Sequence, residues 1–227
     1  MTGAKATMGQ EAAVAHNLAN VATTGFRAEI HRLRAVAVQS ESLPSKAFVV
    51  DASVGSNFST GAVSQTGNSL DVAVNGKGWF AVQTPDGNEA YTRSGSFQVD
   101  ENGVLRTRNG LEVVGDGGQI AIPPDNSVEV SSDGTITAIP VNGARNTANP
   151  VGRLKLVNPP ENELKRGEDG LFRLANGQAA DMDESVKVAG GYLEGSNVNV
   201  VEEMVRMIFL ARQYDLNTKL LQNAQET

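Results

Sequence analysis

The chain begins and ends with helical patterns of apolar residues, and a strand-like pattern lies between them. From residue 1 to about residue 22 there is no proline, and apolar residues recur at alternating spacings of three and four, as in the seam of a coiled coil. The seam residues are Met1, Ala4, Met8, Ala15, Leu18 and Ala22. Because this stripe is thin and an isolated helix of about 20 residues is marginal in water, we expect the helix to need a partner. Thr23, Thr24 and Gly25 then predict a helix-exit turn.

The C-terminal stretch predicts a second helix with a much broader apolar face. Asn199 followed by Glu202 has the spacing of a capping box, so the helix is expected to begin there. One seam contains Val200, Met207, Leu210, Tyr214, Leu221 and Ala224, and an adjacent row contains Val201, Met204, Ile208 and Ala211. Two neighbouring rows are more than one thin partner helix can cover, so we expect this helix to be covered on more than one side.

The middle of the chain predicts antiparallel strands. Short alternating runs such as residues 70–74 and 79–82 have the length and pattern of strands, and Asn-Gly or Asp-Gly pairs typical of tight hairpins separate many of them. We therefore predict a mainly β fold with α: an N-terminal helix (1–25), an irregular connector (26–61), an antiparallel β-rich domain (62–192) and a C-terminal helix (193–227). The two helices are expected to form a coiled-coil-like pair that brackets the β-rich domain.

Composition narrows the function classes. The 24 glycines and 8 prolines fit a turn-rich β domain, and the net charge of −7 gives no attraction to nucleic acid. No cysteine is present, so neither a disulfide framework nor a cysteine metal site is expected. The sequence has no apolar run of transmembrane length and no secretory signal pattern, which predicts a protein that is not membrane-embedded and that leaves the cytoplasm, if it does, by another route.

Residues with catalytic or metal-binding potential form no recognisable site. His16 and His31 have no second histidine at ligand spacing, and we interpret them as packed or solvated side chains. The acidic run at Asp181, Asp183 and Glu184 lacks the glycine and the distant acidic ligand of a calcium loop, so a charged surface turn is expected. No carboxylate pair is singled out for cleaving glycans. We predict no enzymatic activity, no small-molecule substrate, no cofactor and no metal.

Two asparagines near the end of the first helix leave two interpretations open. Asn17 and Asn20 either satisfy helix-terminal carbonyls and water, or fix the register against a neighbouring helix, as buried amides do in coiled coils. In the β-rich region, Arg93 and Trp79 are expected to stabilise the fold rather than bind a ligand. The predicted assembly and helix-packing residues are Asn17, Leu18, Asn20, Val201, Met204, Ile208, Ala211, Tyr214 and Leu221.

Three segments together carry a family resemblance. Residues 17–26 (NLANVATTGF), residues 70–97 with LDVA, GKGWF and YTRSGSF, and residues 196–204 (SNVNVVEEM) resemble, in this order, the signatures of the flagellar rod and hook proteins, the axial family of the bacterial flagellum. Residues 151–157, 166–172 and 211–214 resemble the proximal-rod branch of that family, with the distal-rod branch as the alternative. A β-rich binding module on a helical stalk is the alternative from another class.

The resemblance implies a structural subunit that assembles with itself and with other flagellar rod proteins into a torque-transmitting shaft. It also implies transit through the flagellar type III export apparatus, without a cleaved signal peptide, to the periplasmic rod of the basal body. Family members extend beyond both ends of this sequence, so we expect it to be clipped at each end or its start to be misassigned.

Overall fold

The computed structural model describes residues 2–37, 47–141 and 148–225, and side chains over 6–31, 55–141 and 148–219. Its contacts divide the chain into two units. The helical unit comprises residues 1–22, 27–59 and 197–227, and the β unit comprises residues 23–26 and 60–196. Helices near both ends and antiparallel sheets between them confirm the predicted mainly β fold with two helices.

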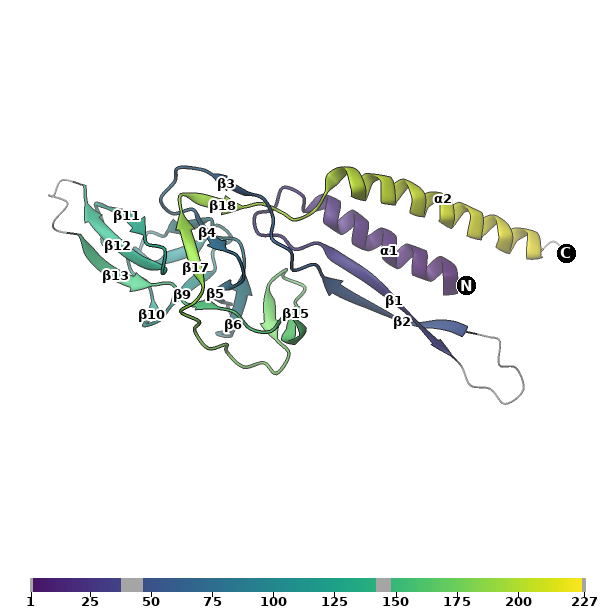
Figure 1. The fold of residues 1–227 in the computed structure, drawn as a ribbon, viewed down its shortest axis with the longest axis horizontal. Helices are drawn as coiled ribbons and strands as arrows, with labels where there is room; N and C mark the ends of the chain where they lie inside the picture. Colours follow the sequence, from purple (N-terminus) through teal and green to yellow (C-terminus); the bar gives the residue numbers. More distant parts are fainter. Residues whose placement is uncertain (1, 38–46, 142–147, 226–227) are drawn as a thin grey trace. The chain divides into compact units, whose positions relative to one another are not determined.

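The helical unit consists of two helices and a long hairpin. Helix α1 (Thr2–Ala19) and helix α2 (Val200–Gln225) lie side by side and antiparallel, as Figure 1 shows. Strands β1 (Glu29–Ala37) and β2 (Ala47–Ser56) pair antiparallel and contact α1. In the part of the chain that the structure describes, neither helix is long and apolar enough to cross a membrane.

The hairpin differs from the irregular connector expected between residues 26 and 61. Its register shifts between Arg34 and Ala35, where a bulge interrupts the ladder. A bulge adds a residue to one strand and breaks the two-residue alternation by which a strand is recognised in sequence. The long strands were therefore missed, although the two segments pair over nearly their whole length.

Helix α1 ends earlier than its sequence pattern predicted. Its last residue is Ala19 rather than a residue near 22, and the N–H of Val21 donates to the carbonyl of Leu18 in a tightened last turn. The buried face also differs from the predicted seam, because Met8 and Ala15 are exposed whereas Thr7, Ala13, Val14 and Asn17 are buried. Gly9 allows β1 to approach closely, since a Cβ there would lie 2.7 Å from Nε2 of His31.

Helix α2 begins where the capping pattern placed it. The first helical residue is Val200, and the side-chain oxygen of Asn199 accepts hydrogen bonds from the backbone N–H groups of Val201 and Glu202. These bonds satisfy two of the donors that the first turn of a helix leaves unpaired. The prediction of a helix start at Asn199 is confirmed.

The β unit consists of short antiparallel strands. Their bounds are β3 (Val63–Gln65), β4 (Val72–Asn75), β5 (Trp79–Gln83), β6 (Glu89–Thr92), β7 (Phe97–Val99), β8 (Leu105–Thr107), β9 (Glu112–Gly115), β10 (Gly118–Gln119), β11 (Asn126–Val130), β12 (Thr135–Pro140), β13 (Asn149–Arg153), β14 (Leu156–Val157), β15 (Leu164–Arg166), β16 (Phe172–Leu174), β17 (Lys187–Gly190) and β18 (Tyr192–Glu194). A short 3-10 helix, η2, covers Glu161–Glu163.

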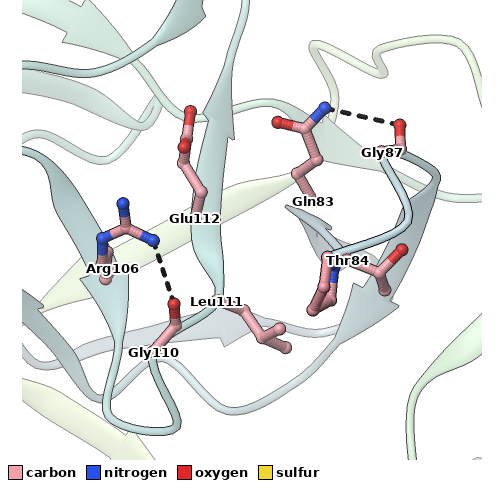
Figure 2. A pocket seen from close by; sticks show the side chains of 8 residues that line it. Gln83, Thr84, Gly87, Arg106, Gly110, Leu111 and Glu112 are labelled. Carbon is pink, nitrogen blue, oxygen red and sulfur yellow. Dashed lines mark hydrogen bonds between the residues drawn. The ribbon is translucent and has the colours of Figure 1, made fainter.

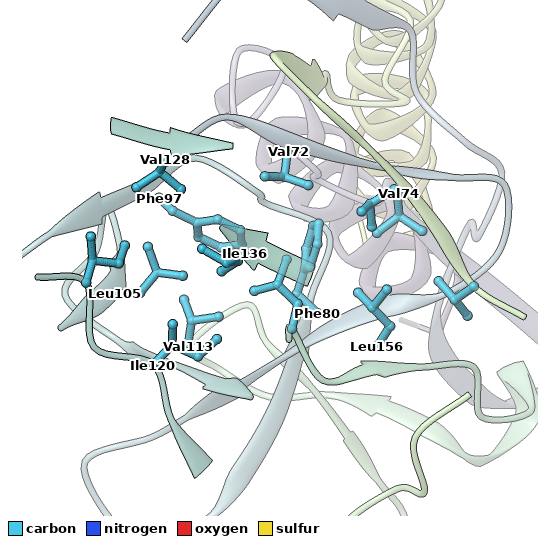
Figure 3. Packing of buried hydrophobic residues seen from close by; sticks show 14 residues of the cluster. Val72, Val74, Phe80, Phe97, Leu105, Val113, Ile120, Val128, Ile136 and Leu156 are labelled. Atoms are coloured by element: carbon cyan, nitrogen blue, oxygen red, sulfur yellow. The ribbon is translucent and has the colours of Figure 1, made fainter. Parts of the chain in front are cut away.

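These strands form four sheets within the β unit. The largest runs β15-β16-β6-β5-β9-β8-β7, with β10 added to β9 and β14 added to β5. A three-stranded sheet runs β11-β12-β13, and the pairs β17-β4 and β18-β3 complete the unit. Fourteen buried apolar side chains of this unit form one cluster that includes Phe80 (Figure 3). The ring centroids of Phe80 and Phe97 lie 5.2 Å apart in an edge-on arrangement.

Candidate assembly surface and the contacts that support it

A buried asparagine joins three elements of the helical unit. Asn17 on α1 is 1% exposed, and its side-chain oxygen accepts the backbone N–H of Glu29 at 2.7 Å. Its side-chain nitrogen donates to the carbonyl of Glu29 at 3.0 Å and to Oε1 of Glu203 on α2 at 3.2 Å. Because one amide contacts both β1 and α2, it fixes the position of α1 against each of them.

Asn20 makes a different contact. Its side-chain nitrogen donates to the carbonyl of His16 at 2.9 Å, one turn back in the same helix. Of the two interpretations left open by the sequence, register against a neighbouring helix fits Asn17, and satisfaction of a terminal carbonyl fits Asn20. Their roles in assembly remain predictions.

A second asparagine, Asn197, ties the start of α2 to the hairpin. Its side-chain oxygen accepts the N–H of Ala28 at 2.7 Å, and its nitrogen donates to the carbonyls of Asn57 and Ser59 at 2.9 Å each. Residues that lead into β1, follow β2 and precede α2 therefore meet at one side chain. Asn197 belongs to the segment 196–204 noted in the sequence, but no local pattern predicts these bonds, because its partners lie more than 130 residues away.

Replacing Asn17 with alanine is expected to destabilise the helical unit by about 1–3 kcal/mol, since the backbone groups of Glu29 lose their partner and the buried carboxylate of Glu203 keeps only its contact with Arg206. The matched change Asn20→Ala, on the same helix, is expected to cost less than about 0.5 kcal/mol. Thermal unfolding followed by far-ultraviolet circular dichroism measures this difference, because α1 and α2 both belong to the helical unit. Equal losses in the two variants would contradict the role given to Asn17.

Helix α2 presents an apolar row to solvent. Val201, Met204, Val205 and Ile208 are exposed by 50–70%, and their spacing places them on one face of the helix. We call these four residues the α2 ridge. Three of them were predicted from the sequence as the row that α1 cannot cover. In the described part of the chain, seven of the eleven exposed large apolar side chains belong to α2.

The other predicted packing residues have varied environments. Leu18 is half-buried, Ala211 is exposed and Tyr214 is at the edge of exposure, whereas the side chain of Leu221 lies outside the described ones. The side of α2 that packs within the unit instead carries Glu203 and Leu210, which are both buried. A buried glutamate was not anticipated, since charged residues are ordinarily exposed unless they are paired.

A groove runs along the helical unit on another side of α2. Its volume is about 390 Å³, and it is lined by Gln10, Ala13, Val14, Glu29, Ile30, His31, Arg206, Phe209, Leu210 and Gln213. We call it the α1–α2 groove. Ala13, Val14 and Leu210 give it a buried apolar floor. The charged groups at its margin are paired within the chain: Arg206 pairs with Glu202 and Glu203, and Glu29 pairs with His16.

In the β unit, a buried ion pair joins segments that are far apart in the sequence. Two nitrogens of Arg93 contact Oε2 of Glu194, at 2.7 Å from Nε and 2.6 Å from Nη2. Arg93 also donates to the carbonyls of Gly78 and Val74, while Oε1 of Glu194 accepts the N–H of Gly61 at 2.8 Å. The expectation that Arg93 stabilises the β fold agrees with these contacts.

Gly25 packs against the backbone of both residues of this ion pair. Its φ of +68° is a conformation that favours glycine, its N–H donates to the carbonyl of Glu194, and a Cβ at this position would lie 2.4 Å from the backbone of Arg93. Helix α1 ends at Ala19 and Gly25 lies at the end of the turn that follows, so its role in the helix exit stays a prediction. Its requirement for glycine comes from the close backbone contact.

The β unit also carries a polar hollow of about 410 Å³ near the β5–β6 and β8–β9 turns (Figure 2). Its lining residues bond to their own turns: Gln83 donates to the carbonyl of Gly87, and Arg106 donates to the carbonyl of Gly110. A hydrogen bond from Arg106 also holds the pKa of Asp100 below its ordinary value. A general acid needs a raised pKa instead, so this carboxyl is not suited to that role.

Metal ligation finds no support in the residues that the structure describes, where no group of three or more His, Asp or Glu side chains could hold an ion. Asp183, in the acidic run weighed above, bonds to the hydroxyl and N–H of Ser185 instead. These hydrogen bonds lower its pKa. This arrangement is that of a polar surface turn.

Comparison with known proteins places these features in a family. Residues 73–138 match the model of the flagellar hook protein FlgE/F/G D1 domain, and residues 189–227 match that of the flagellar basal body rod FlgEFG protein C-terminal region. The chain is 43% identical to the flagellar basal-body rod protein FlgF of Escherichia coli and 41% identical to that of Salmonella typhimurium. Each alignment covers all of this chain and 92% of the relative.

The distal-rod alternative has its own relatives. The flagellar basal-body rod protein FlgG of Buchnera aphidicola (subsp. Schizaphis graminum) is 35% identical over 94% of this chain and 89% of that protein. The higher identities to the two FlgF proteins extend over the whole chain and favour the FlgF branch. Since the helices at both ends, the antiparallel β unit and these full-length similarities agree, the chain belongs to the FlgE/F/G family of flagellar basal-body rod proteins, which are structural subunits and not enzymes.

Proposed function

We propose that this structural subunit of the proximal rod assembles through its terminal helices with copies of itself and with other rod proteins. In this proposal the helical segments, 1–25 and 193–227, line the inner part of the shaft, and the β-rich segment, 62–192, forms its outer layer. Torque then passes from motor to hook through packed interfaces. The α2 ridge carries the proposal, because each apolar side chain that becomes fully buried contributes about 1.5–3 kcal/mol.

The connections inside the helical unit support this role. A shaft that transmits torque needs helices that are held in fixed register, and Asn17 and Asn197 join α1, α2 and the hairpin through side-chain hydrogen bonds. These bonds hold α2 against α1 and the hairpin on the side of α2 opposite the ridge. Apolar contacts supply the affinity between subunits, and buried polar contacts within each subunit supply the register.

We further propose that the chain reaches the periplasmic rod through the flagellar type III export apparatus, without cleavage of a signal peptide. The basal-body rod location of the related FlgF proteins supports this proposal. The export apparatus would then be a transient partner.

The function is tested in a motile bacterium whose own proximal rod subunit is replaced by this chain. Basal bodies are then purified from that strain. We expect the replacement to support swimming, and mass spectrometry of the basal bodies to find the chain with Met1 or its immediate successor as the N-terminus. A strain without either subunit is the control and should not swim. Loss of the chain from the basal bodies of a swimming strain would contradict the function, and a cleaved N-terminal segment would contradict the proposed export route.

A further inference from the structure

We infer that the α2 ridge of one copy of this chain docks into the α1–α2 groove of a second copy. This inference rests on the proposed function and specifies which two surfaces meet. It begins from two features of the same helical unit: a row of exposed apolar side chains, and a hollow with an apolar floor. Both surfaces are apolar, and a projecting row of side chains has a shape that can enter a hollow.

The ridge and the groove adjoin on α2, where Phe209 of the groove follows Val205 of the ridge by one turn, but their outer residues point in different directions. Ile208 of the ridge and Gln213 of the groove are five residues apart on α2, which separates their directions by about 140° at 100° per residue. A contact between two unlike surfaces leaves one ridge and one groove free in every pair of copies. Such a heterologous contact propagates into a ring or a helical array, whereas a ridge-to-ridge contact would stop at a dimer.

The groove accepts side-chain tips rather than a whole helix. Its volume of about 390 Å³ is at the lower end of the range for small-ligand pockets, about 300–1,000 Å³. A few aliphatic side chains, such as those of Met204 and Ile208, fill a space of this kind. This is also how a row of apolar residues on one helix enters the hollow between two others.

The charges around the groove favour an apolar occupant. Arg206 faces Glu202 and Glu203, at 3.4 and 3.5 Å, and Glu29 faces His16 at 3.1 Å. An anionic or cationic ligand would have to compete with these pairs for its partners. An uncharged row that enters the groove removes its own exposed apolar surface, and that of Phe209 in the lining, from water without disturbing them.

The test uses engineered cysteines, because the sequence contains none. One version of the full chain carries Val201→Cys on the ridge and another carries Gln213→Cys at the groove, each with its own epitope tag. Both are produced in one swimming strain, treated with a short thiol-reactive linker, and recovered in basal bodies. If the double strain does not swim, Val205→Cys replaces Val201→Cys. We expect a cross-linked product that carries both tags.

The matched control places the second cysteine on α1 outside the groove, as Ala15→Cys, which is also exposed. We expect the yield of the product that joins Val201→Cys to Ala15→Cys to be at least tenfold lower than the yield of the product that joins Val201→Cys to Gln213→Cys. Equal yields from the groove and control positions would overturn the inference. It would also be overturned if Val201→Cys were cross-linked only to Val201→Cys of another copy. A product that joins Val201→Cys only to a different rod protein would overturn the choice of a second copy. If neither version enters basal bodies of a swimming strain, the proposed function itself fails.

Discussion

Replacing Ile208 with aspartate is expected to abolish swimming while leaving both units of the chain folded. The side chain of Ile208 is 58% exposed in the single chain, so a carboxylate there stays hydrated. In an assembled shaft the same position would be buried, and burial of an unpaired carboxylate costs several kcal/mol. That penalty offsets a large part of the free energy that the three remaining ridge residues contribute at one interface, about 1.5–3 kcal/mol each, and the loss recurs at every interface of the shaft. Motility in soft agar and the amount of chain in purified basal bodies measure the effect.

Two measurements on purified protein separate lost assembly from lost folding. The fluorescence of Trp79, the sole tryptophan and part of the buried core, reports on the β unit. Helical circular dichroism reports on α1 and α2, and neither signal should change by more than the variation between preparations. Lys219→Asp, which places aspartate at an exposed position of α2 beyond the ridge, is the control and should still swim. Normal swimming of the Ile208→Asp strain would refute assembly through the ridge.

The sequence predicted α2 well because the information is local. Asn199 caps the helix through its own next residues, and the surplus of apolar positions is visible within two turns. The pattern of α1 was less informative. Its buried face includes the polar residues Thr7 and Asn17, and a search for apolar spacing passes over them. Asn17 is buried because Glu29 and Glu203 meet it, 12 and 186 residues away.

The same limit applies to charged residues. Arg93 and Glu194 are both almost fully buried although neither lies in an apolar segment that would mark it as a core position. The sequence predicts that Arg93 stabilises the fold but does not identify its partner, which lies 101 residues further on. Turn residues and alternating apolar positions predict that the β unit consists of short antiparallel strands. The order of the strands in the sheets depends on long-range pairings that these local signals do not specify.

Replacing Glu194 with alanine is expected to destabilise the β unit by about 3–5 kcal/mol, because removal of one partner leaves the other charge buried and uncompensated. Arg93 would keep its bonds to the carbonyls of Gly78 and Val74 but lose both contacts to the carboxylate. The N–H of Gly61 would lose its acceptor as well. Denaturant unfolding followed by Trp79 fluorescence measures the loss, since this residue lies in β5 of the same unit.

The exposed pair between Lys77 and Glu161, at 3.2 Å, supplies the matched control. Glu161→Ala makes the same substitution in the same unit, and exposed pairs contribute only about 0.2–1 kcal/mol. The double variant Arg93→Met with Glu194→Leu is expected to lose less than Glu194→Ala alone, because it leaves no unpaired charge in the interior. If Glu194→Ala and Glu161→Ala lose equal stability, the buried pair does not hold the β unit together. If the double variant instead loses more than Glu194→Ala, the hydrogen bonds of Arg93 to the backbone, and not its charge pairing, are what stabilise this region.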